Sequence, residues 1–270
     1  MSDVFFIVGF VRSGTTAFAR ILDTASNAAV FVEQPPKLLI ESRALAKGEL
    51  ADPVSVLRAA RQAQVDEVVN QGLKYGDKSV AYMPFIPYLS ALWDCKIAFL
   101  IRDGRDAVRS LMDWHRFKAH NIYAMKEDGV ESGAVLPEQD PWDYSRLRPN
   151  PGAALFERWQ MMSRFQKCAW YWSTFNALAL DNLAKIATER WKMVDVSNSS
   201  VETVERIFDF LGLSGFDPQV VQGMLDARIN SLFDRTGQAD RFPRWPEWSP
   251  EQKQSFRELA GEMMTRLGYW

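Results

Sequence analysis

The chain has 270 residues, is 47% hydrophobic and 24% charged, and carries a formal net charge of −2 at pH 7. These proportions are typical of a globular protein with a sizeable core. The length suits one large α/β domain, although length alone also permits two. Because the charge is nearly balanced, the surface as a whole does not attract nucleic acid or anionic membrane, and any anion binding must come from local clusters.

The two cysteines, Cys95 and Cys168, are too few for a disulfide framework and lack the spacing of a zinc site. The first apolar run begins within three residues, without the charged segment and cleavage site of a signal peptide. No apolar run approaches the ~20 residues that a bilayer span requires. We therefore expect a cytoplasmic protein with no membrane span and with two ordinary buried thiols.

Apolar runs alternate with amphipathic stretches along the chain, which favours βαβ units and a mostly parallel central sheet. The predicted strands are 4–10, 29–33, 73–78, 96–102 and 191–196. The predicted helices are 15–24, 38–47, 54–70, 106–117, a long helical region over 152–190, 201–211, 218–229 and 249–267. The sequence thus predicts a three-layer α/β/α fold, P-loop NTPase-like, in a single domain spanning 1–270.

The segment 125–151 breaks this rhythm with two glycines and four prolines. Irregular stretches of this length in a compact domain are usually functional or disordered. We expect it to form an irregular loop on the side of the molecule where a substrate binds.

The first strand ends in a glycine-bounded turn, Gly9 to Gly14, that leads directly into a helix. Its spacing fits the phosphate-binding pattern G-x-x-x-x-G-K-[ST] except that Thr15 stands in place of the lysine. Backbone N–H groups at a helix N-terminus can still bind an anion, and Arg12 adds a planar charged fork. The segment Arg12-Ser13-Gly14-Thr15-Thr16 is therefore a candidate anion site. The alternative is a capped turn without a ligand.

A second cluster lies at the end of the fourth predicted strand. Arg102 ends the apolar run, and Ser110 follows two helical turns later. Ligand sites in open α/β sheets lie at the carboxyl ends of strands, so this pair could bind a second phosphate. The alternative is a set of surface ion pairs among Arg102, Asp103, Arg105 and Asp106.

Together the two clusters resemble the two signature motifs of the sulfotransferase superfamily. Enzymes of this superfamily transfer a sulfonyl group from 3′-phosphoadenosine 5′-phosphosulfate (PAPS) to a hydroxyl or an amine. RSGTT resembles the 5′-phosphosulfate loop, and Arg102 with Ser110 resembles the 3′-phosphate pair. The order RSGTT, FVEQP, GDK, IRDGRDAVRS is similar to the protein-tyrosine sulfotransferase branch and its bacterial relatives. A weaker likeness continues through FDFLGL and the terminal LGY.

The resemblance implies PAPS as donor and no metal, which would account for the missing loop lysine. It implies that Glu33 is the base that takes the acceptor's proton and that Lys78 stabilises charge on the departing oxygen. It also implies a late basic loop over the 3′-phosphate, for which Arg235 and Gly237 are the candidates, although a plain surface loop fits these residues equally well.

Other residues could replace Glu33 as the base. Glu41 is the second choice, whereas His115 and His120 follow the 3′-phosphate motif and are out of place for that role. The sequence departs from the family at Trp114, where the tyrosine-specific branch has an arginine. It also lacks a tyrosine over 191–198.

The expected acceptor is a small, partly apolar molecule with a hydroxyl group, in a pocket walled by residues 35–41 and 125–151 and lined by aromatics such as Trp142 and Tyr144. Two alternatives stay open. A P-loop kinase for a small molecule or nucleotide would need ATP and Mg²⁺. A non-catalytic nucleotide-binding protein would leave Glu33 and Lys78 pointing away from the loop.

Overall fold

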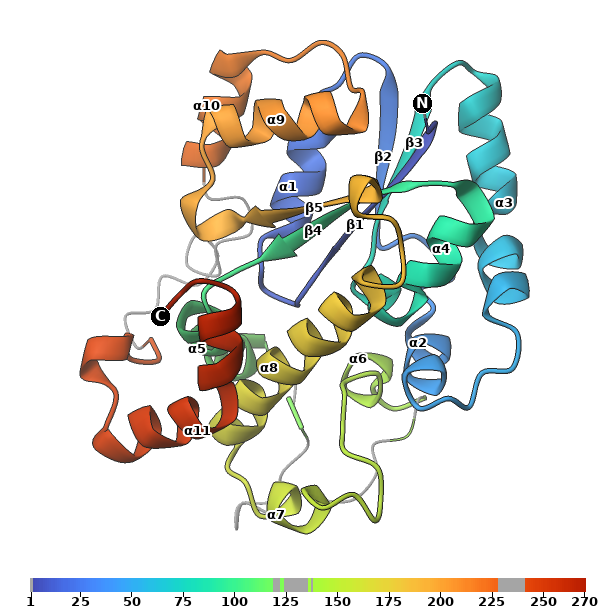
Figure 1. Cartoon of the computed structure of the whole chain (residues 1–270). Coiled ribbons are helices and arrows are strands. Elements are labelled where there is room, and N and C mark those ends of the chain that lie inside the picture. The colour runs from blue at the N-terminus through green and yellow to red at the C-terminus, as the bar shows by residue number, and fades with distance from the viewer. Residues whose placement is uncertain (1, 119–121, 124–135, 137, 228–240) are drawn as a thin grey trace. The chain divides into compact units, whose positions relative to one another are not determined.

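The computed structural model describes residues 2–118, 122–123, 136, 138–227 and 241–270, and of 115–118 it describes only the helical backbone (Figure 1). The chain divides into two compact units. Residues 1–101 and 178–230 form the first, and residues 102–177 and 231–270 form the second. Helix α8 (Arg164–Leu183) contributes residues to both units. The single domain over 1–270 stays a prediction.

Among the described residues, five strands of the first unit form one all-parallel sheet in the order β2-β3-β1-β4-β5. Each predicted strand is confirmed, with both ends within one residue of the expected place. The strands are β1 (Val4–Gly9), β2 (Ala28–Val32), β3 (Lys74–Lys78), β4 (Lys96–Ile101) and β5 (Trp191–Asp195). Because parallel strands end at one edge, the turns after β1, β2 and β3 all leave the same edge of the sheet.

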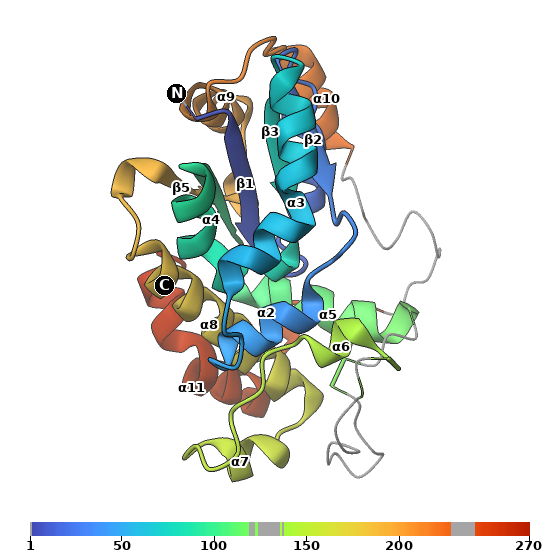
Figure 2. The same ribbon diagram turned by 90° about the vertical axis from the view of Figure 1, so that its right-hand side faces the viewer.

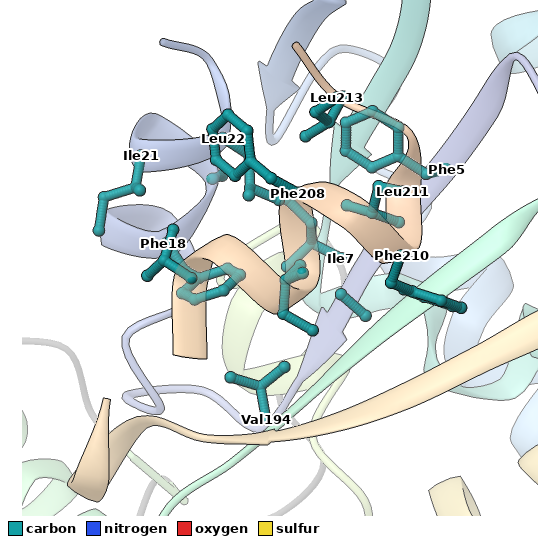
Figure 3. Close-up of a cluster of buried hydrophobic side chains, with 14 of the residues drawn as sticks. Phe5, Ile7, Phe18, Ile21, Leu22, Val194, Phe208, Phe210, Leu211 and Leu213 are labelled. Atoms are coloured by element: carbon teal, nitrogen blue, oxygen red, sulfur yellow. The ribbon is translucent and has the colours of Figure 1, made fainter. Parts of the chain in front are cut away.

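One face of this sheet is covered by α1 (Thr15–Leu22), α9 (Val201–Leu211) and α10 (Pro218–Asp226) (Figure 1). The apolar stripes of these helices pack together on the strands and form a buried core (Figure 3). Its labelled members are Phe5 and Ile7 of β1, Phe18, Ile21 and Leu22 of α1, Val194 of β5, Phe208, Phe210 and Leu211 of α9, and Leu213.

The opposite face is covered by α3 (Pro53–Asn70), the 3₁₀ helix η1 (Val80–Phe85) and α4 (Ile86–Trp93), and Figure 2 shows α3 in front of the sheet. The ring of Phe6 in β1 lies 5.2 Å from that of Tyr82 and 5.6 Å from that of Trp93. Helices on both faces make the three-layer α/β/α arrangement that the sequence predicts. The unit also contains α2 (Leu39–Ala46) and the 3₁₀ helices η2 (Thr188–Arg190) and η3 (Val196–Asn198).

The second unit is helical in its described part. It contains α5 (Gly104–Lys118), α6 (Pro141–Tyr144), α7 (Phe156–Gln160), most of α8, the 3₁₀ helix η4 (Trp245–Glu247) and α11 (Pro250–Arg266). Aromatic rings form its core. The ring centres of Phe165 and Trp248 lie 4.9 Å apart, and those of Trp245 and Phe256 lie 5.7 Å apart. None of the helices in the described ranges is long and apolar enough to cross a membrane.

The predicted long helical region over 152–190 is two helices, α7 and α8. A new helix start separates them, because the Ser163 hydroxyl accepts the Gln166 N–H at 3.3 Å and the Gln166 side chain accepts the Ser163 N–H at 2.9 Å. This reciprocal pair caps the N-terminus of α8. The break could not be predicted from the apolar pattern, because aromatic residues continue through both helices.

Candidate active site

The loop of residues 9–16 follows β1 and has the tight geometry that its glycines predict. A Cβ atom at Gly9 would lie 2.7 Å from the Leu100 carbonyl oxygen, so a larger residue does not fit there. Gly14 has a φ of +70°, a conformation that side chains other than glycine rarely adopt, and the neighbouring Arg12 adopts it at +67°. The Ser13 N–H closes the turn on the Phe10 carbonyl oxygen at 3.0 Å.

The N-terminus of α1 has no side-chain cap within the described ranges, and its first turn contains no acidic residue. The N–H groups of the first turn are therefore directed at the loop with the positive end of the helix dipole. The Ser13 hydroxyl oxygen is buried and has no hydrogen-bond partner within the described part of the chain. These groups fit a phosphate or sulfonate oxygen, which accepts hydrogen bonds and carries negative charge.

Lys78 lies on the same face of the sheet as α1. It is the last residue of β3 and pairs in register with Ile7 of β1 and Val32 of β2. Residues in register on parallel strands point to the same face, and Ile7 belongs to the core packed under α1. Only 5% of the Lys78 side chain is exposed. Its ammonium group therefore lies at the end of β3, on the face where α1 begins after the loop.

Glu33 and Lys78 form an ion pair at this edge. The Lys78 Nζ donates to the Glu33 Oε1 at 2.5 Å. The Ser79 hydroxyl donates to Oε2 at 3.0 Å, and the Val80 N–H donates to Oε1 at 3.3 Å. Both oxygens of the Glu33 carboxylate are thus held, in a site where its side chain is 18% exposed. The sequence placed Glu33 and Lys78 at neighbouring strand ends, and the structure brings them into direct contact.

The backbone of Glu33 leaves the strand in an unusual conformation. Its φ is +51°, although its N–H still donates to the Lys78 carbonyl oxygen at 2.9 Å. An extended Glu33 would point to the opposite face from Val32. The positive φ ends that alternation and lets the carboxylate reach Lys78. Such a conformation in a residue other than glycine costs about 1–3 kcal/mol and persists where the surroundings enforce it.

Of the remaining candidates for the base and the late loop, the structure describes Glu41 and leaves the side chains of the others undescribed. Glu41, the second choice for the base, lies in the first turn of α2. Arg235, Gly237 and His120 lie outside the described residues, as does the side chain of His115. Their proposed roles stay predictions.

Arg102 and Ser110 belong to the second unit, where Arg102 directly follows β4 and Ser110 lies on α5. The Arg102 carbonyl oxygen accepts the Trp172 indole N–H at 3.2 Å. Burial lowers the pKa of the Arg102 guanidinium, and the charge of Arg109 lowers it further, while Asp106 and Asp103 oppose both effects. A bound anion would favour the charged form of such a guanidinium.

Two contributors were missed by sequence reasoning. The Ser79 hydroxyl donates to the Glu33 carboxylate. Its place directly after the GDK motif could have pointed to it. Arg109 acts on Arg102, and its Nε is buried with no hydrogen-bond partner among the residues that the structure describes. Its place directly before Ser110 in the second motif could have pointed to it.

The predicted acceptor-side segment 125–151 is described only in part, since residues 124–135 and 137 lie outside the described ranges. In its described part, Asp143 of α6 is buried and accepts hydrogen bonds from Arg146 at 3.0 Å and Arg148 at 2.8 Å. Its carboxylate also accepts the Tyr123 N–H at 2.6 Å. These contacts organise the backbone around α6, the helix that contains Trp142 and Tyr144.

Comparisons with known proteins identify the fold. No family model matches the chain, and no curated protein is significantly similar to it in sequence. Among solved structures, sulfotransferase STF9 from Mycobacterium avium is similar over 98% of this chain and 76% of its own, with a TM-score of 0.53 at 13% identity. Mouse sulfotransferase SULT7A1, complexed with PAP, is similar over 97% of this chain and 85% of its own, with a TM-score of 0.50 at 16% identity.

The chain therefore has the sulfotransferase fold, and the resemblance seen in its motifs is confirmed at the level of the fold. Similarity at 13% and 16% identity concerns the fold alone. The likeness to the protein-tyrosine branch stays a prediction.

Proposed function

We propose that the protein is a sulfotransferase that transfers a sulfonyl group from PAPS to a hydroxyl or amine acceptor. The observation that carries the proposal is the Glu33–Lys78 pair, held at the carboxyl edge of the sheet on the face where α1 begins, in a chain with the sulfotransferase fold. That placement favours an enzyme over a non-catalytic nucleotide-binding protein, in which these side chains would point away from the loop. The mouse neighbour bound to PAP supports the choice of donor.

The residues of the loop fit the 5′ end of the donor. Its phosphosulfate would accept hydrogen bonds from the N–H groups at the start of α1 and from the buried Ser13 hydroxyl. Arg12 would supply the charged fork that the loop otherwise lacks, because Thr15 replaces the usual lysine. That Arg102 and Ser110 bind the 3′-phosphate is proposed from the resemblance of their motif alone. That no metal takes part stays a prediction.

When bound, PAPS supplies a sulfonyl group on a phosphate that can leave. Glu33 acts as the base and takes the proton of the acceptor hydroxyl as its oxygen forms a bond to sulfur. Lys78 stabilises the negative charge that develops on the departing oxygen. The rate then comes from holding these groups in line with the acceptor.

The ion pair seen between Glu33 and Lys78 has a consequence for this chemistry. The bond from Lys78 to Glu33 at 2.5 Å uses one of the three N–H donors of the ammonium. We expect another of these donors to reach the departing oxygen when the donor binds, with the Ser79 hydroxyl and Val80 N–H still orienting the Glu33 carboxylate. The acceptor is proposed to be a small, partly apolar hydroxyl compound bound near residues 35–41 and 125–151.

The test is transfer of label from radioactive PAPS to a panel of phenols, alcohols and amines. The wild type should label at least one acceptor. Glu33→Gln should bind adenosine 3′,5′-bisphosphate as the wild type does and lose transfer by a factor of about 10²–10⁴. Glu67→Gln, on the exposed side of α3, is the matched control and should transfer normally. Phosphoryl transfer from ATP–Mg²⁺ in place of sulfonyl transfer would establish the kinase alternative.

A further inference from the structure

Arg61 is a charged side chain that is almost completely buried, with 1% of its surface exposed. It lies on α3, which covers the face of the sheet opposite to α1 (Figure 1). Its Nε donates to the Asp77 Oδ2 at 2.8 Å and to the Tyr82 hydroxyl at 2.7 Å. Arginine is almost never fully buried unless its charge is paired. The partners of Arg61 meet that condition.

The other donors of Arg61 hold the turn that follows Glu33. Its terminal nitrogens donate to three successive carbonyl oxygens, those of Gln34 at 3.0 Å, Pro35 at 3.4 Å and Pro36 at 2.9 Å. Proline has no N–H, so this turn cannot be fixed through N–H donors at two of its three residues. The carbonyl contacts from Arg61 therefore take their place, directly after the residue whose φ is +51°.

The second arm of the same network reaches the residue before Lys78. Asp77 pairs in register with Phe6, whereas Lys78 pairs with Ile7, so the two side chains point to opposite faces of the sheet. The Asp77 Oδ2 accepts hydrogen bonds from Arg61, from the Tyr75 hydroxyl at 3.0 Å and from the Tyr82 hydroxyl. One guanidinium is thus bonded to the chain immediately next to Glu33 and to the chain immediately next to Lys78.

The energetics of a buried ion pair suggest that stability is not its main use. The free-energy cost of removing two charges from water offsets most of the attraction between them. Replacing such a pair with apolar residues is therefore often neutral or stabilising. Burial raises the pKa of Asp77, while its hydrogen bond from Tyr82 and the charge of Arg61 act against that rise. Burial and the charge of Asp77 together raise the pKa of Tyr82 well above its usual range. The Tyr82 hydroxyl therefore stays a donor at every physiological pH.

We propose that Arg61 is a positioning residue that, through the Gln34–Pro36 carbonyls and Asp77, fixes Glu33 and Lys78 against each other from the far face of the sheet. It touches neither of these side chains and acts through their neighbours in the chain, the Gln34–Pro36 carbonyls and the Asp77 carboxylate. This role rests on the proposed function, because positioning matters for rate only if Glu33 and Lys78 react.

The decisive variant is Arg61→Lys, which keeps a positive charge opposite Asp77 but replaces the planar fork with one compact ammonium. That ammonium cannot bond three carbonyls and a carboxylate together. We expect kcat to fall about 100-fold, as for a misplacement of reacting groups by about 1 Å. The affinity for adenosine 3′,5′-bisphosphate should change less than twofold, because the loop proposed to bind it joins β1 to α1. Arg58→Lys, one turn earlier and exposed on the same helix, is the control and should behave as wild type.

A second variant separates positioning from stability. Arg61→Met with Asp77→Asn removes both charges, so no charge is left buried alone, and we expect its stability to exceed that of Arg61→Met. Its kcat should nevertheless stay low, since the three carbonyls remain without their donor. If kcat returned to the wild-type value in this double variant, Arg61 would be purely structural and the proposal would be wrong.

Hydrogen exchange tests the positioning without any activity. In Arg61→Lys the amide of Glu33, which donates to Lys78, should exchange at least tenfold faster, while peptides of α1 and the Arg58→Lys control stay unchanged. Unchanged exchange at Glu33 would overturn the positioning role. If the wild type transferred no sulfonyl group, the proposed function would fail, and this exchange result would still decide whether Arg61 holds the turn.

Discussion

Replacing Lys78 by methionine removes the ammonium from the Glu33–Lys78 pair and keeps an apolar chain of similar length. The pair is partly buried, with 5% of the Lys78 side chain and 18% of the Glu33 side chain exposed. Methionine can occupy the space of the lysine stem, so the change tests the charge and the hydrogen bond. It leaves the packing of β3 against the core nearly intact.

The expected loss of stability follows from what Glu33 retains. Removing one partner of a fully buried ion pair costs about 3–5 kcal/mol, and a hydrogen bond to a charged group contributes about 1.5–3 kcal/mol. Glu33 keeps the Ser79 hydroxyl, the Val80 N–H and some solvent. We therefore expect the free energy of unfolding to fall by about 1.5–3 kcal/mol. Urea unfolding with an unchanged m-value measures it.

The same substitution should have a larger effect on the reaction. Loss of a cation where charge develops lowers kcat by roughly 10²–10³, measured as single-turnover transfer from PAPS. Lys74→Met is the control on the same strand, where the ammonium donates to the Ser2 carbonyl oxygen at 2.7 Å. It should leave transfer unchanged. If Lys78→Met kept wild-type turnover and a free energy of unfolding within about 0.5 kcal/mol of the wild type, the pair would contribute neither to stability nor to the reaction.

Three further outcomes test the fold and the loop. Gly9→Ala should destabilise the protein by about 1–3 kcal/mol and weaken bisphosphate binding, because its Cβ would lie 2.7 Å from the Leu100 carbonyl oxygen; wild-type stability by urea unfolding would contradict the tight turn. Ser200→Ala should cost about 1 kcal/mol, since its hydroxyl caps α9, and an unchanged urea midpoint would contradict that cap. Burial raises the pKa of Cys95 and of Cys168 to about 12, so both thiols stay protonated at pH 8; rapid labelling of the folded protein by a thiol reagent at that pH would show that they are exposed.

The sheet could be predicted from the sequence because β1, β2 and β4 are short apolar runs and amphipathic stretches separate the strands. The helix over η1 and α4 could not. Its residues are apolar all round and include Pro84 and Pro87, so neither a helical nor a strand period stands out. Its burial against Phe6 decides its structure, and that contact is a tertiary one.

Part of the site could be predicted as well. Glu33 directly follows β2 and Lys78 ends the neighbouring β3, so parallel pairing alone brings their backbones together. The positive φ that turns the Glu33 carboxylate toward Lys78 leaves no mark in the local sequence. The role of Arg61 could not be predicted from the sequence for a similar reason. It lies in a helix that also carries the exposed Arg58, and its partner Asp77 is sixteen residues away on another element.

The most direct test of the account is thermal unfolding with adenosine 3′,5′-bisphosphate compared with ATP–Mg²⁺. A ligand at 100 times its dissociation constant stabilises the folded state by about 2.7 kcal/mol, which corresponds to roughly 5–10 °C for a chain of this size. A donor site at the loop of residues 9–16 should give this shift with the bisphosphate, and a reduced shift when Ser13 is replaced by valine. Stabilisation by ATP–Mg²⁺ alone, or by neither ligand, would contradict a site made for a phosphosulfate donor.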